Sequence, residues 1–326
     1  MRTTFAAAVT FAAVTLSLAV PATPPATAAR TANATRTANT ARTANGTRTA
    51  NATRAPAVAE AGGGAHGPHG PHGPRGVGAR SAVLADMGSG RVLWSRRAGV
   101  RRPIGSIAKV MTAVVVLREG RLDRTVRIRP RHVAYAAARH GTTARLRPGD
   151  RITARELLSA MMLPSGCDAA AALADAYGPG RAGFLRKMNR TARALGLRRT
   201  RYADESGLPP APGNSTARDQ AALGRYAMGF PLFRRVVGQR RHVLRRGPHH
   251  KRYVWRSTND LMGRYRGLLG IKSGYTSAAG YCLLFAARRG GRTLVGVVLH
   301  SSRTRRAARF QDARRMLDWG FLASRR

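Results

Sequence analysis

Two short segments of this chain place a serine hydroxyl close to a lysine amine. Ser106 is followed three residues later by Lys109 at the start of an apolar run, and Lys272 is followed directly by Ser273 late in the chain. A serine becomes a nucleophile when a neighbouring base removes its proton, and a neutral lysine amine is such a base. The two segments therefore predict a site for nucleophilic catalysis.

Lysine is rare in this chain, which gives these positions weight. Lysine and arginine together number 58, and only four are lysines, Lys109, Lys187, Lys251 and Lys272. Arginine stays protonated in proteins, whereas a lysine removed from water can lose its proton. The use of lysine at positions 109 and 272 indicates that the amine itself is needed there.

The elements around these residues favour one common site. Two residues three apart on a helix share a face, so the Lys109 amine can reach the Ser106 hydroxyl. A third segment, from Pro164 to Asp168, joins two predicted helices and can direct the Ser165 hydroxyl to the same place. Without a function, this segment would simply end one helix and provide Asp168 as the N-cap of the next.

In this order the segments resemble the serine DD-peptidases of the penicillin-binding protein and β-lactamase superfamily. The likeness is greatest to the D-alanyl-D-alanine carboxypeptidases, peptidase family S11, and it runs from about Ser81 to the last predicted helix. The segments that carry it are residues 109–113, 163–166, 168–170, 215–219, 258–261, 272–276 and 279–280.

The resemblance implies a role for each matched residue. Ser106 would attack the carbonyl between two terminal D-alanines, Lys109 would take its proton, and Ser165 would help pass a proton to the departing D-alanine. Water would then release the shortened peptidoglycan stem peptide, without a cofactor or metal. β-Lactams would acylate Ser106 as inhibitors because their ring mimics the substrate backbone.

The resemblance also implies how the substrate is held. Lys272 would keep the site electropositive, and the Ser273 hydroxyl would contact the terminal carboxylate. The backbone N–H groups of Ser106 and Tyr275 would stabilise the oxyanion, at about 3 kcal/mol per donor. A further candidate contact for the carboxylate is the arginine cluster at positions 303, 305 and 306.

Two positions depart from the family pattern. Cys167 stands where the family has an asparagine that binds the substrate, and a thiol is a poor donor and acceptor. Hydrolysis of the acyl-enzyme would then weaken, which makes transfer to an amine, as in a DD-transpeptidase, an alternative function. Ser273 replaces the usual threonine but keeps the hydroxyl.

Two other functions stay open. A class A-like β-lactamase needs a deacylating glutamate, and Glu205 has a suitable Glu-x-x-Leu pattern, although Pro209 stands where asparagine is expected. A catalytically degenerate, basic wall-binding protein would explain both Cys167 and the formal net charge of +44. Cys167 and Cys282 could form a disulfide in an oxidising compartment, although the place of Cys167 in the site segment argues against this.

Strand and helix patterns predict an α/β (α+β) fold. Alternating runs at both ends predict an antiparallel sheet built from both ends of the domain, flanked by helices, with an inserted all-helical lobe. The strands are expected at 81–86, 91–95, 281–287 and 293–299, and the helices at 106–117, 154–162, 168–177, 184–195 and 305–319.

The chain divides into three predicted parts. Residues 1–29 resemble a secretory signal peptide, residues 30–79 form a low-complexity, disordered tether of Arg-Thr-Ala-Asn and His-Gly-Pro repeats, and residues 80–326 form the DD-peptidase domain. The protein is expected to be a monomer outside the cytoplasmic membrane or in the cell wall. Its basic charge would favour anionic wall polymers as partners rather than nucleic acid.

Overall fold

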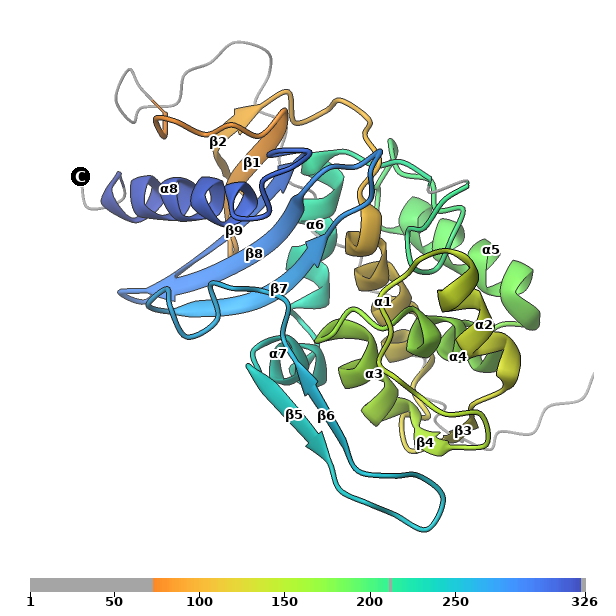
Figure 1. Cartoon of the computed structure of the whole chain (residues 1–326). Helices are drawn as coiled ribbons and strands as arrows, with labels where there is room; N and C mark the ends of the chain where they lie inside the picture. Colours follow the sequence, from red (N-terminus) through yellow and green to blue (C-terminus); the bar gives the residue numbers. More distant parts are fainter. Residues whose placement is uncertain (1–72, 211–212, 324–326) are drawn as a thin grey trace, which may run out of the picture. The chain divides into compact units, whose positions relative to one another are not determined.

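A five-stranded antiparallel sheet organises the protein. The computed structural model describes residues 73–210 and 213–323 (Figure 1). The strands lie in the order β2–β1–β9–β8–β7, so strands from both ends of the domain meet in one sheet, as predicted. Their bounds are Ser81–Asp86 for β1, Val92–Arg96 for β2, Leu268–Gly274 for β7, Cys282–Arg289 for β8 and Arg292–Leu299 for β9.

The sheet is buried on both faces because its central strands are apolar at successive positions. Side chains alternate between the faces of a strand, so Leu283 and Phe285 of β8 enter one apolar cluster while Leu284 enters the other. Helix α8, Ala308–Leu322, packs on the first face, and α6, Ala217–Ala227, packs on the second (Figure 1). Strand β7 lies at the edge of the sheet, where it pairs with β8.

The inserted lobe surrounds a buried helix. In α1 every residue from Lys109 to Leu117 is buried, which agrees with the apolar run in its sequence. The helices of this region are η1, Gly105–Ala108; α1, Lys109–Glu119; α2, Pro130–Ala138; α3, Ala154–Met162; α4, Cys167–Tyr177; α5, Gly180–Ala194; and α7, Pro231–Val237.

The region between the two halves of the sheet is not entirely helical. It also contains two small two-stranded sheets that the sequence patterns did not predict. These pair β3, Thr125–Arg127, with β4, Arg151–Thr153, and β5, Arg241–Leu244, with β6, Tyr253–Arg256.

Asp168 does not cap α4 as predicted. The helix begins at Cys167, with Gly166 as its N-cap. The Asp168 carboxylate instead accepts the backbone N–H groups of Ala144, at 2.8 Å, and Leu146, at 3.1 Å. Asp168 therefore attaches the loop before β4 to the first turn of α4, because that loop has unpaired donors to satisfy.

The packed part of the chain begins before the predicted boundary at residue 80. Val77 and Ala79 are buried, and the backbone N–H of Gly78 donates to Asp312 of α8 at 2.8 Å. The last residues of the predicted tether therefore belong to the folded unit. The predicted signal peptide and the rest of the tether lie outside the described residues. Among the described residues, none of the helices has the length and apolar character needed to span a membrane.

Candidate active site

Ser106 and Lys109 are in direct contact at the start of the buried helix. Lys109 Nζ donates to Ser106 Oγ at 3.0 Å, and the two side chains are 0% and 7% exposed, respectively. Nζ also lies 3.3 Å from Cys167 Sγ and 3.2 Å from the carbonyl oxygen of Ser206. The lysine amine is thus fixed by three neighbours and is positioned to exchange a proton with the serine.

The turn that carries Ser106 packs against the end of β7. A Cβ atom on Gly105, which has a φ of +53°, would lie 3.0 Å from the backbone nitrogen of Tyr275. A Cβ atom on Gly274 would lie 2.6 Å from the carbonyl oxygen of Ile104. Glycine at both positions permits this approach. It brings the turn that carries Ser106 against the backbone of Gly274 and Tyr275 at the end of β7.

Lys272 supplies a second buried amine on β7. It is 1% exposed, and its Nζ donates to the carbonyl oxygen of Ser273 at 3.0 Å. Burial and then the nearby cations Lys109 and Arg309 lower the pKa of Lys272 well below its usual value. Two ammonium groups in one dry site repel each other, so the site favours the loss of one proton. The adjacent Ser273 hydroxyl shares a 2.8 Å hydrogen bond with Thr258 Oγ1.

Ser165 has a hydroxyl without a partner. Its Oγ is buried and makes no hydrogen bond within the described residues, and its backbone has a φ of +67°. Thr142 Oγ1 donates to its carbonyl oxygen at 2.7 Å. A left-handed non-glycine residue and an unpaired buried hydroxyl both cost stability, and such features gather at functional sites.

Cys167 faces the lysine amine rather than solvent. Its side chain is fully buried, and a Cβ atom on Gly141 would lie 2.9 Å from its sulfur. Cys167 and Cys282 are both free in the structure. The disulfide that the sequence left open therefore does not form in the described fold.

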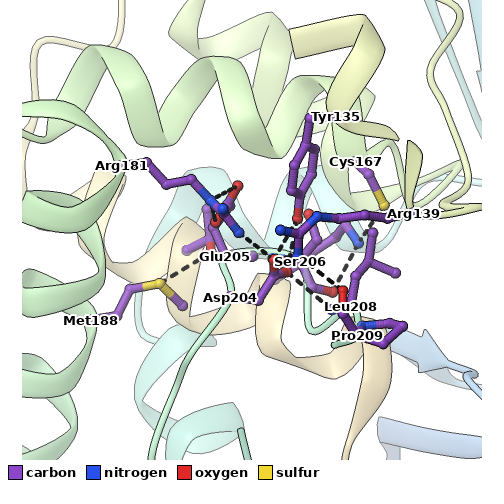
Figure 2. Close-up of polar contacts among 12 residues, drawn as sticks. Tyr135, Arg139, Cys167, Arg181, Met188, Asp204, Glu205, Ser206, Leu208 and Pro209 are labelled. Carbon is purple, nitrogen blue, oxygen red and sulfur yellow. Dashed lines mark hydrogen bonds and ion pairs between the residues drawn. The ribbon is translucent and has the colours of Figure 1, made fainter. Parts of the chain in front are cut away.

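Sequence reasoning did not find the ionic cluster behind Lys109, which Figure 2 shows. Arg181 of α5 donates to Asp204 at 2.6 Å and to Glu205 at 2.8 Å. Asp204 Oδ1 also accepts the backbone N–H groups of Ser206, at 2.7 Å, and Leu208, at 3.0 Å. The cluster thereby fixes residues 204–208, whose Ser206 carbonyl holds Lys109.

Glu205 is engaged within this cluster. Its carboxylate is fully buried against Arg181, and its carbonyl oxygen accepts Thr112 Oγ1 at 2.7 Å. Burial and then the Asp204 carboxylate raise the pKa of Glu205, and Arg181 opposes this rise. The geometry gives Glu205 a structural partner and does not favour the role of a deacylating base.

Arg309 of α8 is a second residue that sequence reasoning missed. It is buried, and its Nη1 donates to the carbonyl oxygen of Gly274 at 3.0 Å. Burial and the neighbouring Arg306 lower the pKa of Arg309 to about 10. Arg306 itself pairs with Asp260 at 2.7 Å, and Arg303 and Arg305 are exposed. The arginine that supports β7 thus lies one helical turn beyond the predicted cluster, on the buried face of α8.

Comparison with known proteins agrees with this geometry. A family profile described as D-alanyl-D-alanine carboxypeptidase matches residues 69–303. A D-alanyl-D-alanine carboxypeptidase from Streptomyces sp. (strain K15) is 39% identical over 246 residues, which cover 72% of this chain and 84% of the relative. The D-alanyl-D-alanine carboxypeptidase DacB2 of Mycobacterium tuberculosis is 35% identical over 246 residues, which cover 74% and 82%.

The fold is similar to solved structures as well. The crystal structure of the Streptomyces K15 DD-transpeptidase matches with a TM-score of 0.72 and 38% identity, covering 76% of this chain and 98% of that chain. The order of the motifs, the sheet built from both ends of the domain and these matches all indicate the same family. The chain belongs to the D-alanyl-D-alanine carboxypeptidase family of serine peptidases.

Proposed function

We propose that this chain is a secreted DD-peptidase that removes the terminal D-alanine from peptidoglycan stem peptides through an acyl-enzyme on Ser106. The observation that carries the proposal is the 3.0 Å contact between Lys109 Nζ and Ser106 Oγ in a buried site. The family to which the chain belongs acts on peptides that end in D-Ala-D-Ala.

Acylation begins with proton transfer from Ser106 to Lys109. Lys272 lies close enough to Lys109 for the two charges to interact. Lys109 is the amine that touches the Ser106 hydroxyl, so we assign to it the role of accepting the proton. The serine oxygen then attacks the penultimate carbonyl, and the N–H groups of Ser106 and Tyr275 bind the developing oxyanion.

Collapse of this intermediate releases D-alanine. The unpaired Ser165 hydroxyl can relay a proton to the departing amine. The Ser273 hydroxyl binds the carboxylate of the leaving residue, while Lys272 and Arg309 keep its surroundings electropositive. Water then attacks the ester, with Lys109 again as the base.

The test is to measure D-alanine released from a D-Ala-D-Ala peptide, with and without an added amine. Release that requires Ser106, and that disappears in Ser106→Ala, supports the proposal. A folded protein that neither releases D-alanine nor reacts with a penicillin would leave the degenerate wall-binding function instead. Rapid, repeated hydrolysis of the penicillin would indicate a β-lactamase.

Transpeptidation is a second candidate, and Cys167 favours it. The thiol replaces an amide that could hold the substrate backbone, and the similar Streptomyces K15 structure is that of a DD-transpeptidase. In Cys167→Asn, a new amide hydrogen bond should raise the share of acyl-enzyme that reacts with water by about tenfold at most. The ratio of hydrolysis to transfer, measured with one peptide and one amine, checks this. An unchanged ratio in the folded variant would remove Cys167 from the explanation.

The ionic cluster should act by positioning Lys109. Asp204→Asn breaks a buried charge network, so we expect the free energy of unfolding to fall by about 3 kcal/mol. The rate of acylation should fall while KM for the peptide stays the same, because the cluster touches the base and not the substrate. Asp123→Asn is the matched control, since Asp123 forms an exposed ion pair with Arg155. Equal losses in both variants would argue against positioning.

We also propose that the domain acts outside the cytoplasmic membrane. The predicted signal peptide at residues 1–29 and the greater part of the predicted tether at residues 30–79 precede the domain. The net charge of +44 would hold the protein near anionic wall polymers. Sequencing the N-terminus of the exported protein tests cleavage after residue 29.

A further inference from the structure

A cavity of about 400 Å³ lies at the base of the β5–β6 hairpin. Four exposed arginines and three other polar residues dominate its lining, and we refer to it as the arginine pocket. These residues are Arg240, Arg241, Arg256, Arg264, Ser257, Asn259 and Asp260.

The arginine pocket has an excess of positive charge that the described chain does not neutralise. Arg241 and Arg256 lie directly opposite each other on paired strands. Like charges in such a pair destabilise a sheet. The only carboxylate among the lining residues, Asp260, pairs with Arg306 of α8 at 2.7 Å. The four arginines of the pocket form no ion pair among the described residues, so an anion bound between them would offset their repulsion.

A buried amide adds a donor to this charge. Asn259 is 4% exposed, and its Oδ1 accepts the backbone N–H of Leu261 at 3.2 Å. Its Nδ2 has no acceptor within the described residues. Buried amide groups are almost always paired. Guanidinium forks and an amide N–H₂ group together match a carboxylate, which accepts several hydrogen bonds at once.

The arginine pocket is connected to the candidate active site through Thr258. Thr258, which lies between lining residues, shares a 2.8 Å hydrogen bond with the Ser273 hydroxyl. Its backbone N–H donates to the carbonyl oxygen of Leu163 at 3.1 Å, two residues before Ser165. Under the proposed function, Ser273 binds the carboxylate of the departing D-alanine. An amine acceptor replaces that residue and so enters from the same side.

We propose that the arginine pocket binds a carboxylate of the amine acceptor in transfer reactions, an inference that rests on the proposed function. The acceptor nitrogen attacks the ester carbon of the acyl-enzyme, the bond to Ser106 Oγ breaks, and an amide bond forms. Lys109 accepts the proton from the amine and returns a proton to Ser106. A second carboxylate on the acceptor, beyond the one at Ser273, occupies the pocket and holds the amine in place.

The experiment compares acceptors that differ in one charged group. D-Glutamate and D-glutamine share their backbone, but only the former has a side-chain carboxylate. We expect transfer to D-glutamate to exceed transfer to D-glutamine by about tenfold, the value of one charge-assisted hydrogen bond. R241Q/R256Q should abolish this preference and leave transfer to D-glutamine unchanged.

A matched variant distinguishes binding in the arginine pocket from general attraction of acidic acceptors to the basic surface. Arg118 and Arg190 are exposed and line a different cavity, beside α1 and α5. R118Q/R190Q removes the same charge and should keep the preference for D-glutamate. Loss of the preference in both double variants, its persistence in R241Q/R256Q, or no transfer to any acceptor would overturn the inference. Acylation by a penicillin is measured in the same samples. If the pocket inference fails, acylation should persist, whereas failure of the proposed function would abolish acylation.

Discussion

Lys109→Arg should lower the rate at which a penicillin acylates Ser106 by about 10²- to 10⁴-fold, the usual contribution of a general base. The substitution keeps the positive charge but removes the ability to give up a proton. Lys109 Nζ donates to Ser106 Oγ at 3.0 Å. Among the described residues no other amine contacts this hydroxyl, so no other amine can replace Lys109 as the base. The acylation rate, followed by mass spectrometry, measures the effect.

The control is Lys251→Arg, since Lys251 lies over the Tyr253 ring in the β5–β6 region. It should acylate at the wild-type rate. The guanidinium is larger than the amine, so Lys109→Met provides a variant of similar size to lysine in case Lys109→Arg does not fold. A folded Lys109→Arg or Lys109→Met protein with near-normal acylation would show that Lys109 is not the base.

Lys272→Met should weaken turnover of the D-Ala-D-Ala peptide by about 10²- to 10³-fold, as expected when an electrostatic group is removed from the reacting centre. The same variant should be at least as stable as the wild type at neutral pH. A buried charge is costly, and an apolar side chain of similar size is often neutral or stabilising in its place.

The pH dependence of the free energy of unfolding tests the predicted effect of Lys272 on stability. The pKa of Lys272 is lowered well below 10.5 in the folded protein, so the unfolded state binds more protons between the two values. The free energy of unfolding should therefore rise with pH across that window, with the full penalty present below the folded pKa. Lys272→Met should lack this part of the rise, whereas Lys251→Met should retain it. Identical profiles for wild type and Lys272→Met would contradict the assignment.

The sequence predicted the elements that depend on local patterns. The β1–β2 hairpin follows from two alternating runs around Gly90, which has a φ of +80° in the structure. The last helix was expected from residue 305 but begins at Ala308. The Ser302 hydroxyl accepts the backbone N–H groups of Thr304 and Arg305, at 3.2 and 3.0 Å, and so forms a turn before the helix. Apolar periodicity does not report such a side-chain contact.

In the candidate site, too, the residues related by local spacing could be predicted, and those paired across different elements could not. Ser106 and Lys109 could be paired from their spacing alone, because one helical turn fixes their distance. Arg181, Asp204 and Arg309 could not be found, because their partners come from other elements and no local pattern marks such pairs. The Glu-x-x-Leu pattern indicates a catalytic role for Glu205 as a deacylating base. Its ion pair with Arg181 does not favour that role.

The role of Ser106 as the nucleophile is tested most directly by identifying the residue that a penicillin modifies. The purified protein is incubated with a penicillin, digested, and mapped by mass spectrometry, with Ser106→Ala in parallel. We expect one covalent adduct on Ser106 and no adduct in the variant. An adduct on Ser165 or Ser273 instead, or none on a folded wild-type protein, would contradict it.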